Sequence, residues 1–196
     1  MTRAKSMLKK VMGTVLAAAM TMSLSVSVFA ATPATIKVTF NDNEQPEVSA
    51  TVSTQPLIDT GTYFQGEVLE KILNSSKLVE GEPFVMKYGD QATLLDVINK
   101  AAISVQANPV YGATNQYTPN GIYIDSLFGK GTVNNYIDND GDGKADEWQG
   151  SYWNIKYSDE NGAPYDAAYY ANNELLENTP VTDINFTYET TTMPID

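Results

Sequence analysis

The residues of this chain best suited to do chemistry form an acidic loop at 138–149, which reads DNDGDGKADEWQ. Its first, third, fifth and ninth positions are carboxylates and its sixth is glycine. An oxygen cage for Ca²⁺ needs this pattern, because alternate side chains converge and glycine permits a sharp turn. The sequence therefore predicts a structural calcium site. Its candidate ligands are Asp138, Asp140, Asp142, the carbonyl of Lys144, Asp146 and Gln149.

The loop resembles the calcium loops of EF-hands and of the related repeats that lack helices. It departs from the EF-hand rule at the twelfth position, where Gln149 replaces a bidentate glutamate. We therefore expect weak binding, with a dissociation constant of roughly 10⁻⁴ to 10⁻³ M. Neither flank has a helical pattern, so a calcium sensor is not expected. The alternative is a solvated Asp/Gly turn, although carboxylates packed this closely repel one another without a cation.

Catalysis is restricted by what the chain lacks, since it contains no histidine and no cysteine. Their absence excludes Ser-His and Cys-His nucleophiles, thiol redox chemistry and ordinary zinc or haem sites. Hydrolysis of a glycoside by two carboxylates stays open, because the chain has 24 acidic residues. No phosphate-binding glycine loop or dinucleotide fingerprint is present. We predict a protein that is not an enzyme.

A second group of candidate residues is aromatic and lies between 148 and 170. Aromatic rings offer flat apolar area with a polar tip, which suits stacking on a sugar, a macrocycle or a protein partner. Trp153 and Tyr157 share a predicted strand face with Ile155, so we expect them in the core. The rings that we expect at the surface, as ligand contacts, are Tyr152, Tyr169 and Tyr170.

The segment 1–30 has the plan of a cleavable signal peptide. Four basic residues precede an apolar run from Val11 to Val28, and Val28 and Ala30 suit signal peptidase. A membrane anchor is the competing interpretation, but it needs about 20 strongly apolar residues, and threonines and serines dilute this run. We predict a secreted, extracellular protein whose residues 31–196 form one domain. A lipid anchor is not expected, because no cysteine follows the run.

The charge of the mature chain limits its partners. The formal net charge is −12, and removal of residues 1–30 takes away four of the twelve basic residues and no acidic one, which gives −16. Such a surface repels phosphate backbones and anionic lipid, so nucleic acid partners and membrane insertion are not expected. The expected partner is a small-molecule ligand or another surface protein.

Hydrophobic periodicity places the candidate residues on an α+β framework. Helical spacing predicts helices at 64–74 and 93–101, and Thr93 and Asp96 form a capping box at the start of the second. The segment 108–120 is predicted as a loop. Strands around one or two helices, without repeated strand–helix alternation, indicate α+β. Alternating apolar residues predict strands at 35–41, 48–53, 84–88, 153–157 and 184–188, the first two as a hairpin.

Four segments, taken in order, resemble the transcobalamin-like C-terminal domain family. They are FVMKYGDQATLLDVINKAA at 84–102, NGIYIDSLFGKG at 120–131, GSYWNIKY at 150–157 and the closing turn and strand at 175–188. The family is a β-grasp-type module of secreted and surface proteins, common in Gram-positive bacteria. The resemblance implies a β-grasp-like mixed sheet with one or two helices, and a non-catalytic binding module outside a Gram-positive cell.

The resemblance also suggests a ligand. In the vertebrate cobalamin carriers that name the family, this module closes over one face of a corrinoid, so a corrinoid-like small molecule is the first expectation. Two alternatives stay open: a cell-surface adhesion or scaffold domain that binds another protein, and a carbohydrate-binding domain that uses exposed aromatics. A concave apolar pocket beside Tyr152 and Tyr169 favours a ligand, whereas a flat acidic face favours a partner protein.

Overall fold

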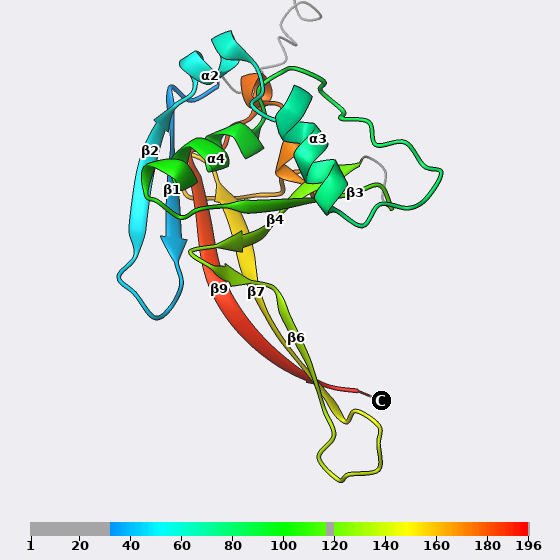
Figure 1. The fold of residues 1–196 in the computed structure, drawn as a ribbon. Coiled ribbons are helices and arrows are strands. Elements are labelled where there is room, and N and C mark those ends of the chain that lie inside the picture. Colours follow the sequence, from blue (N-terminus) through cyan, green and yellow to red (C-terminus); the bar gives the residue numbers. More distant parts are fainter. Residues whose placement is uncertain (1–31, 117–119, 196) are drawn as a thin grey trace, which may run out of the picture.

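The computed structural model describes residues 32–116 and 120–195. The predicted signal segment therefore lies outside the described residues. Within them the chain is a mixed α+β structure with two sheets (Figure 1). Among the described helices, none combines the length and the apolar content that crossing a bilayer requires.

The large sheet has six strands and places the first and last strands of the chain side by side. The strand order is β2 (Val48–Ser53), β1 (Thr35–Asn41), β9 (Asp183–Pro194), β7 (Glu147–Ser158) and β6 (Val133–Ile137), with β8 (Pro164–Tyr165) paired to β7. Strand β1 runs parallel to β9 and antiparallel to β2, while β7 runs antiparallel to β9, β6 and β8.

A smaller sheet and the helices pack beside the large sheet (Figure 1). The smaller sheet consists of β3 (Val110–Thr114), β4 (Gly121–Leu127) and β5 (Lys130–Gly131), paired in that order. The helices are α2 (Gln55–Thr60), α3 (Gly66–Ser75) and α4 (Leu94–Ser104), followed by two short 3₁₀ turns, η1 (Ala171–Asn173) and η2 (Leu176–Asn178).

The core forms where the apolar faces of β1, β9 and α4 meet. Ile36, Val38 and Phe40 alternate along β1 and are all buried, as the period of a strand with one apolar face requires. The Phe40 ring stacks on Phe186 of β9 with 5.2 Å between centroids. Eight of the eleven residues of α4 are buried, so this helix supplies much of the core.

The capping box of α4 also ties the helix to the segment before α3. Asp96 accepts hydrogen bonds from the Thr93 backbone N–H at 2.7 Å, the Thr62 hydroxyl at 2.9 Å and the Tyr63 backbone N–H at 2.8 Å. The Asp96 residue is 2% exposed. Burial raises the pKa of Asp96 above its ordinary value, and the donated hydrogen bonds oppose that rise. Asp96 is therefore a buried junction between two segments.

The structure confirms the predicted hairpin at 35–41 and 48–53 and the predicted helices near 64–74 and 93–101, including the capping box. The strand predicted at 84–88 is wrong, because this segment is irregular and ends in a turn. Its alternation has a different cause: Phe84 and Met86 pack against the core without a neighbouring strand to pair with. The predicted loop at 108–120 contains β3.

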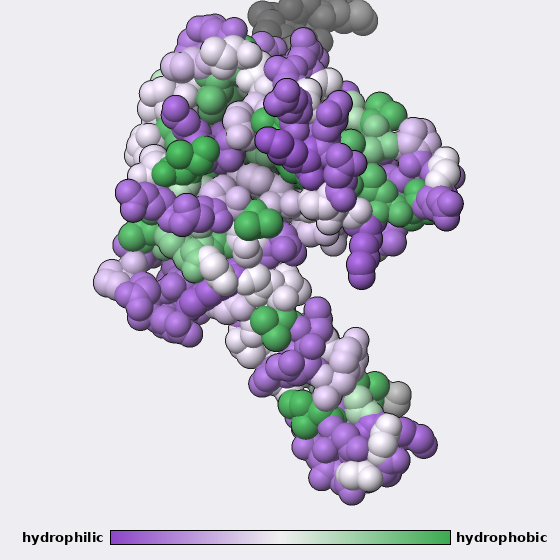
Figure 2. Space-filling model, viewed as in Figure 1, coloured by the Kyte–Doolittle hydropathy of each residue, from purple (hydrophilic) through white to green (hydrophobic). Residues whose placement is uncertain are grey.

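Strands β7 and β9 are longer than predicted and form an arm. The arm consists of β6, residues 147–152 of β7, residues 189–194 of β9, and the loop 138–146 at its tip. It projects from the rest of the molecule as a twisted ribbon (Figure 1). Mainly hydrophilic residues cover its tip (Figure 2). The sequence did not reveal the arm because its polar Asn, Gln, Ser and Thr residues hide the strand period.

Candidate functional site

A concave pocket of about 520 Å³ lies between the small sheet and β7. Buried Leu95 of α4 and Ile122 of β4 contribute to its lining. Its aromatic lining consists of Tyr123 of β4, Trp153 and Tyr157 of β7, and Tyr169 and Tyr170 just before η1. A volume of this size, lined by several aromatic side chains together with polar groups, lies within the range of small-molecule sites.

Two of these rings lie directly on glycines. The Tyr123 ring covers Gly112 of β3, its partner across the ladder, and the Tyr170 ring covers Gly121 at the start of β4. A Cβ atom at either glycine would overlap the ring above it. The two rings can take these positions only because the residue beneath has no side chain.

Buried asparagines hold the Tyr169–Tyr170 segment against β4. The Asn172 side chain accepts a hydrogen bond from the Ile122 backbone N–H at 2.9 Å, and the Asn173 side chain donates one to the Asn120 carbonyl at 3.1 Å. Both asparagines are buried. The Tyr169 and Tyr170 rings meet edge to face, with 4.7 Å between centroids. Side chains of η1 thus position one wall of the pocket.

The opposite wall is fixed by Trp153. Its indole Nε1 donates a hydrogen bond to the Lys130 carbonyl of β5 at 2.9 Å, and its ring packs against Tyr188 of β9 with 5.2 Å between centroids. Four residues further along β7, burial raises the pKa of Tyr157, and the charge of Glu174 adds to the rise. None of the β7 residues that line the pocket is charged.

A second hollow, of about 480 Å³, continues from the first and shares Tyr157 and Tyr169 with it. Tyr165 lies in this hollow, and its hydroxyl donates a hydrogen bond to Glu174 at 2.7 Å. Burial, followed by this hydrogen bond, raises the pKa of Tyr165 to about 12. The same carboxylate accepts the Ala168 backbone N–H at 3.2 Å and so orders the chain that leads to Tyr169.

The predicted ligand residues fall in three different environments. Tyr169 lines the pocket and is 88% exposed. Tyr170 also lines it, but the prediction that it lies at the surface is wrong, since it is 8% exposed. Tyr152 alternates with Trp153 and so lies on the other face of β7, where its hydroxyl is 3.5 Å from that of Thr191.

Sequence reasoning missed several pocket residues. Trp153 and Tyr157 were expected in the core; they do pack against it, but they are only half-buried and also line the pocket. Tyr123 has apolar neighbours on its strand, and Asn172 follows two tyrosines and an alanine in a segment without a regular pattern, so the sequence singles out neither residue. The useful signal is the set of glycines on β3 and β4, which permit close approach by a ring.

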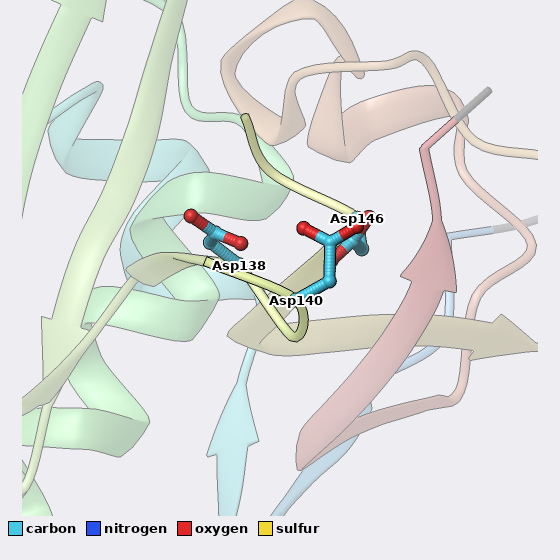
Figure 3. A group of neighbouring side chains, drawn as sticks. All are labelled: Asp138, Asp140 and Asp146. Carbon is cyan, nitrogen blue, oxygen red and sulfur yellow. The ribbon is translucent and has the colours of Figure 1, made fainter. Parts of the chain in front are cut away.

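The acidic loop lies at the tip of the arm, between β6 and β7. Asp138, Asp140 and Asp146 each offer a carboxylate oxygen, and these oxygens lie within 4.8 Å of one another (Figure 3). Asp142 is outside this group, and its carboxylate accepts the Lys144 backbone N–H at 2.8 Å. Gln149 lies within β7, where it is paired with Asn135 and Thr192. The structure thus brings three of the six predicted ligand residues together.

Backbone hydrogen bonds shape this loop. Asp138 accepts the N–H groups of Gly143 at 2.8 Å and Gly141 at 2.6 Å, and these bonds hold the pKa of Asp138 below its ordinary value. Asp146 accepts the Asn139 N–H at 2.6 Å. Converging carboxylate oxygens are what a hard cation such as Ca²⁺ prefers. Strands, not helices, flank the loop, as the sequence indicated.

Comparisons with known proteins identify no relative of this chain. Searches of protein-family models, of curated proteins and of solved structures found no match to this chain. The resemblance to the transcobalamin-like C-terminal domain therefore depends on the sequence motifs alone.

Proposed function

We propose that this protein is a secreted, non-catalytic binding module that holds a small planar ligand, corrinoid-like in character, in the pocket between β4 and β7. The observation that carries the proposal is the pair of tyrosine rings seated on Gly112 and Gly121. Rings fixed in this way present flat apolar faces at little entropic cost, which is how a site gains affinity for a planar molecule.

We also propose that the large sheet is of β-grasp type. Its first and last strands are parallel neighbours, and each has an antiparallel partner on its outer side. Helix α4 contacts both β1 and β2. The corrinoid is proposed from the four sequence segments that resemble the transcobalamin-like family, and this order of strands is compatible with the β-grasp-type fold that the resemblance implies. A corrinoid is too large to be enclosed in this pocket, so one edge of the macrocycle would enter it.

Protein interaction through the arm is the second candidate function. The arm exposes Tyr136 at 70% and Met193 at 50%, and both are ladder partners of Trp148. The indole Nε1 of Trp148 donates a hydrogen bond to Asn134 at 3.1 Å, which fixes the ring over Gly150. Exposed, fixed aromatic side chains of this kind are frequent at protein interfaces.

The pocket is tested by equilibrium dialysis of the mature protein against cyanocobalamin and dicyanocobinamide. We expect retention of both corrinoids above a protein blank. Replacing Tyr169 by alanine should weaken binding roughly 3- to 10-fold, because one stacked ring is worth about 0.5 to 1.5 kcal/mol. Tyr136→Ala is the matched control, since Tyr136 is also an exposed tyrosine but lies on the arm. Equal retention by the wild type and the blank would contradict the proposal.

We propose further that the acidic loop binds Ca²⁺ and stiffens the tip of the arm. A tenfold excess of Ca²⁺ over the dissociation constant should stabilise the fold by about 1.4 kcal/mol and so raise the melting temperature. Asp140→Ala should abolish that rise, because it removes one of the three converging carboxylates. Asp159→Ala is the control, since Asp159 caps a different turn through the Asn161 N–H. Identical melting curves in Ca²⁺ and in chelator would remove the claim.

A further inference from the structure

The charge around the pocket is unlike the charge of the rest of the chain. The protein carries 24 acidic and 12 basic residues, so carboxylates dominate its surface. Among the described residues that line the pocket there is no carboxylate, and Lys77 is the single charged side chain. Lys77 is thus the one charged group in the described lining that a ligand in the pocket can meet, and it attracts a negative substituent at short range.

The Lys77 side chain is free to meet a ligand. Within residues 32–116 and 120–195, both salt bridges involve Lys130, so no carboxylate of this part of the chain lies within 4.0 Å of Lys77. Lys77 is exposed and follows the last residue of α3 by two positions. Its ammonium group can therefore turn toward the pocket without breaking a salt bridge.

The backbone on either side of Lys77 is anchored beside the pocket. The Ser76 hydroxyl accepts the Ala113 backbone N–H of β3 at 2.7 Å, and the Asn115 side chain accepts the Val79 backbone N–H at 2.6 Å. These bonds tie the segment that follows α3 to β3 and to Asn115, the residue directly after β3. Lys77 is therefore held at the pocket rim by its neighbours, while its own side chain stays available.

We infer that the ligand of this pocket carries an anionic group, a carboxylate, phosphate or sulfonate, beside its planar apolar part, and that Lys77 receives that group. The inference rests on the proposed function and adds the charge of the ligand to it. The aromatic rings give affinity for any flat apolar molecule, and Lys77 distinguishes a molecule with a negative substituent from one without.

Two fluorescent dyes of the same skeleton isolate this contribution. The anionic dye 1-anilinonaphthalene-8-sulfonate and the neutral dye N-phenyl-1-naphthylamine differ in one sulfonate, and both become fluorescent in an apolar site. We expect the wild-type protein at low ionic strength to bind the sulfonate dye about 1.5- to 5-fold more tightly, the range of an exposed ion pair. Added salt should reduce this preference, because it screens the charges.

Substitution of Lys77 tests whether this residue causes the preference for the sulfonate dye. Lys77→Gln should bring the two dissociation constants together and leave that of the neutral dye unchanged. Lys71→Gln is the matched control, because Lys71 is an exposed lysine of α3 that does not line the pocket. A preference for the sulfonate dye that survives Lys77→Gln, or no preference in the wild type, overturns the inference about charge. Neither result contradicts the proposal that the pocket binds a planar ligand. Failure of both dyes to bind contradicts the proposed function itself.

Discussion

Replacing Gly121 by alanine should displace the Tyr170 ring and weaken ligand binding about 10-fold. The new Cβ would overlap ring carbons of Tyr170, which is buried and cannot move aside cheaply, because Asn172 holds the adjoining turn to β4. Overpacking of this kind costs about 1 to 3 kcal/mol of stability. Loss of one ordered ring from the pocket accounts for the weaker binding. Urea denaturation and dialysis against dicyanocobinamide measure the two effects.

A double-mutant cycle shows whether the ring is the cause. Tyr170→Ala removes the overlapping atoms, so Gly121→Ala should cost little stability in that background. The difference between the two backgrounds should fall within the range of about 0.5 to 3 kcal/mol found for residues in contact. Gly121→Ala with the stability and affinity of the wild type would show that the glycine does not position Tyr170.

Asp96→Ala should destabilise the protein by about 3 to 5 kcal/mol, a large part of the 5 to 15 kcal/mol typical of a domain. The substitution removes the acceptor of four hydrogen bonds, whose donors are the Thr93 N–H and hydroxyl, the Thr62 hydroxyl and the Tyr63 N–H. Buried donors without an acceptor cost about 1 to 3 kcal/mol each, and water entering the site offsets part of that. The midpoint of urea denaturation should fall with an unchanged slope.

Asp90→Ala is the control for this prediction. Asp90 is also an aspartate near α4, but it is exposed, and its contact with the fold is made by its backbone carbonyl, which accepts the Thr62 N–H at 2.7 Å. Alanine keeps that carbonyl, so a change within about 0.5 kcal/mol is expected. If Asp96→Ala is equally mild, the buried junction between α4 and the segment before α3 does not hold the fold together.

Local sequence signals predicted the elements whose neighbours are close in the chain. The alternation of Ile36, Val38 and Phe40 places β1, and Thr93 with Asp96 places the start of α4, because strand period and helix capping depend on a few adjacent residues. The segment 84–88 shows the limit of this reasoning. Its apolar side chains face the core, but no strand lies beside its backbone. Whether a segment forms a strand depends on hydrogen bonding to a neighbouring strand, and the sequence of the segment alone does not show that neighbour.

The candidate pocket could not be predicted because its walls come from distant parts of the chain. Tyr123, Trp153 and Tyr170 stand on β4, β7 and the segment before η1, and only the packing of two sheets brings them together. The sequence predicts Trp153 as a core residue, because it shares a strand face with Ile155. Nothing in the sequence shows that Trp153 stays partly exposed. The acidic loop differs, because its candidate ligands are local, and three of its carboxylates do converge.

The two tryptophans of this protein provide the most direct test of the binding site, since one lies in the pocket and the other on the arm. Their indole N–H signals can be followed separately by NMR while dicyanocobinamide is added to the mature, calcium-loaded protein. A ligand seated between β4 and β7 should shift the Trp153 signal in a saturable manner and leave the Trp148 signal in place. Movement of the Trp148 signal alone, or of neither, would contradict the assignment of this pocket as the binding site.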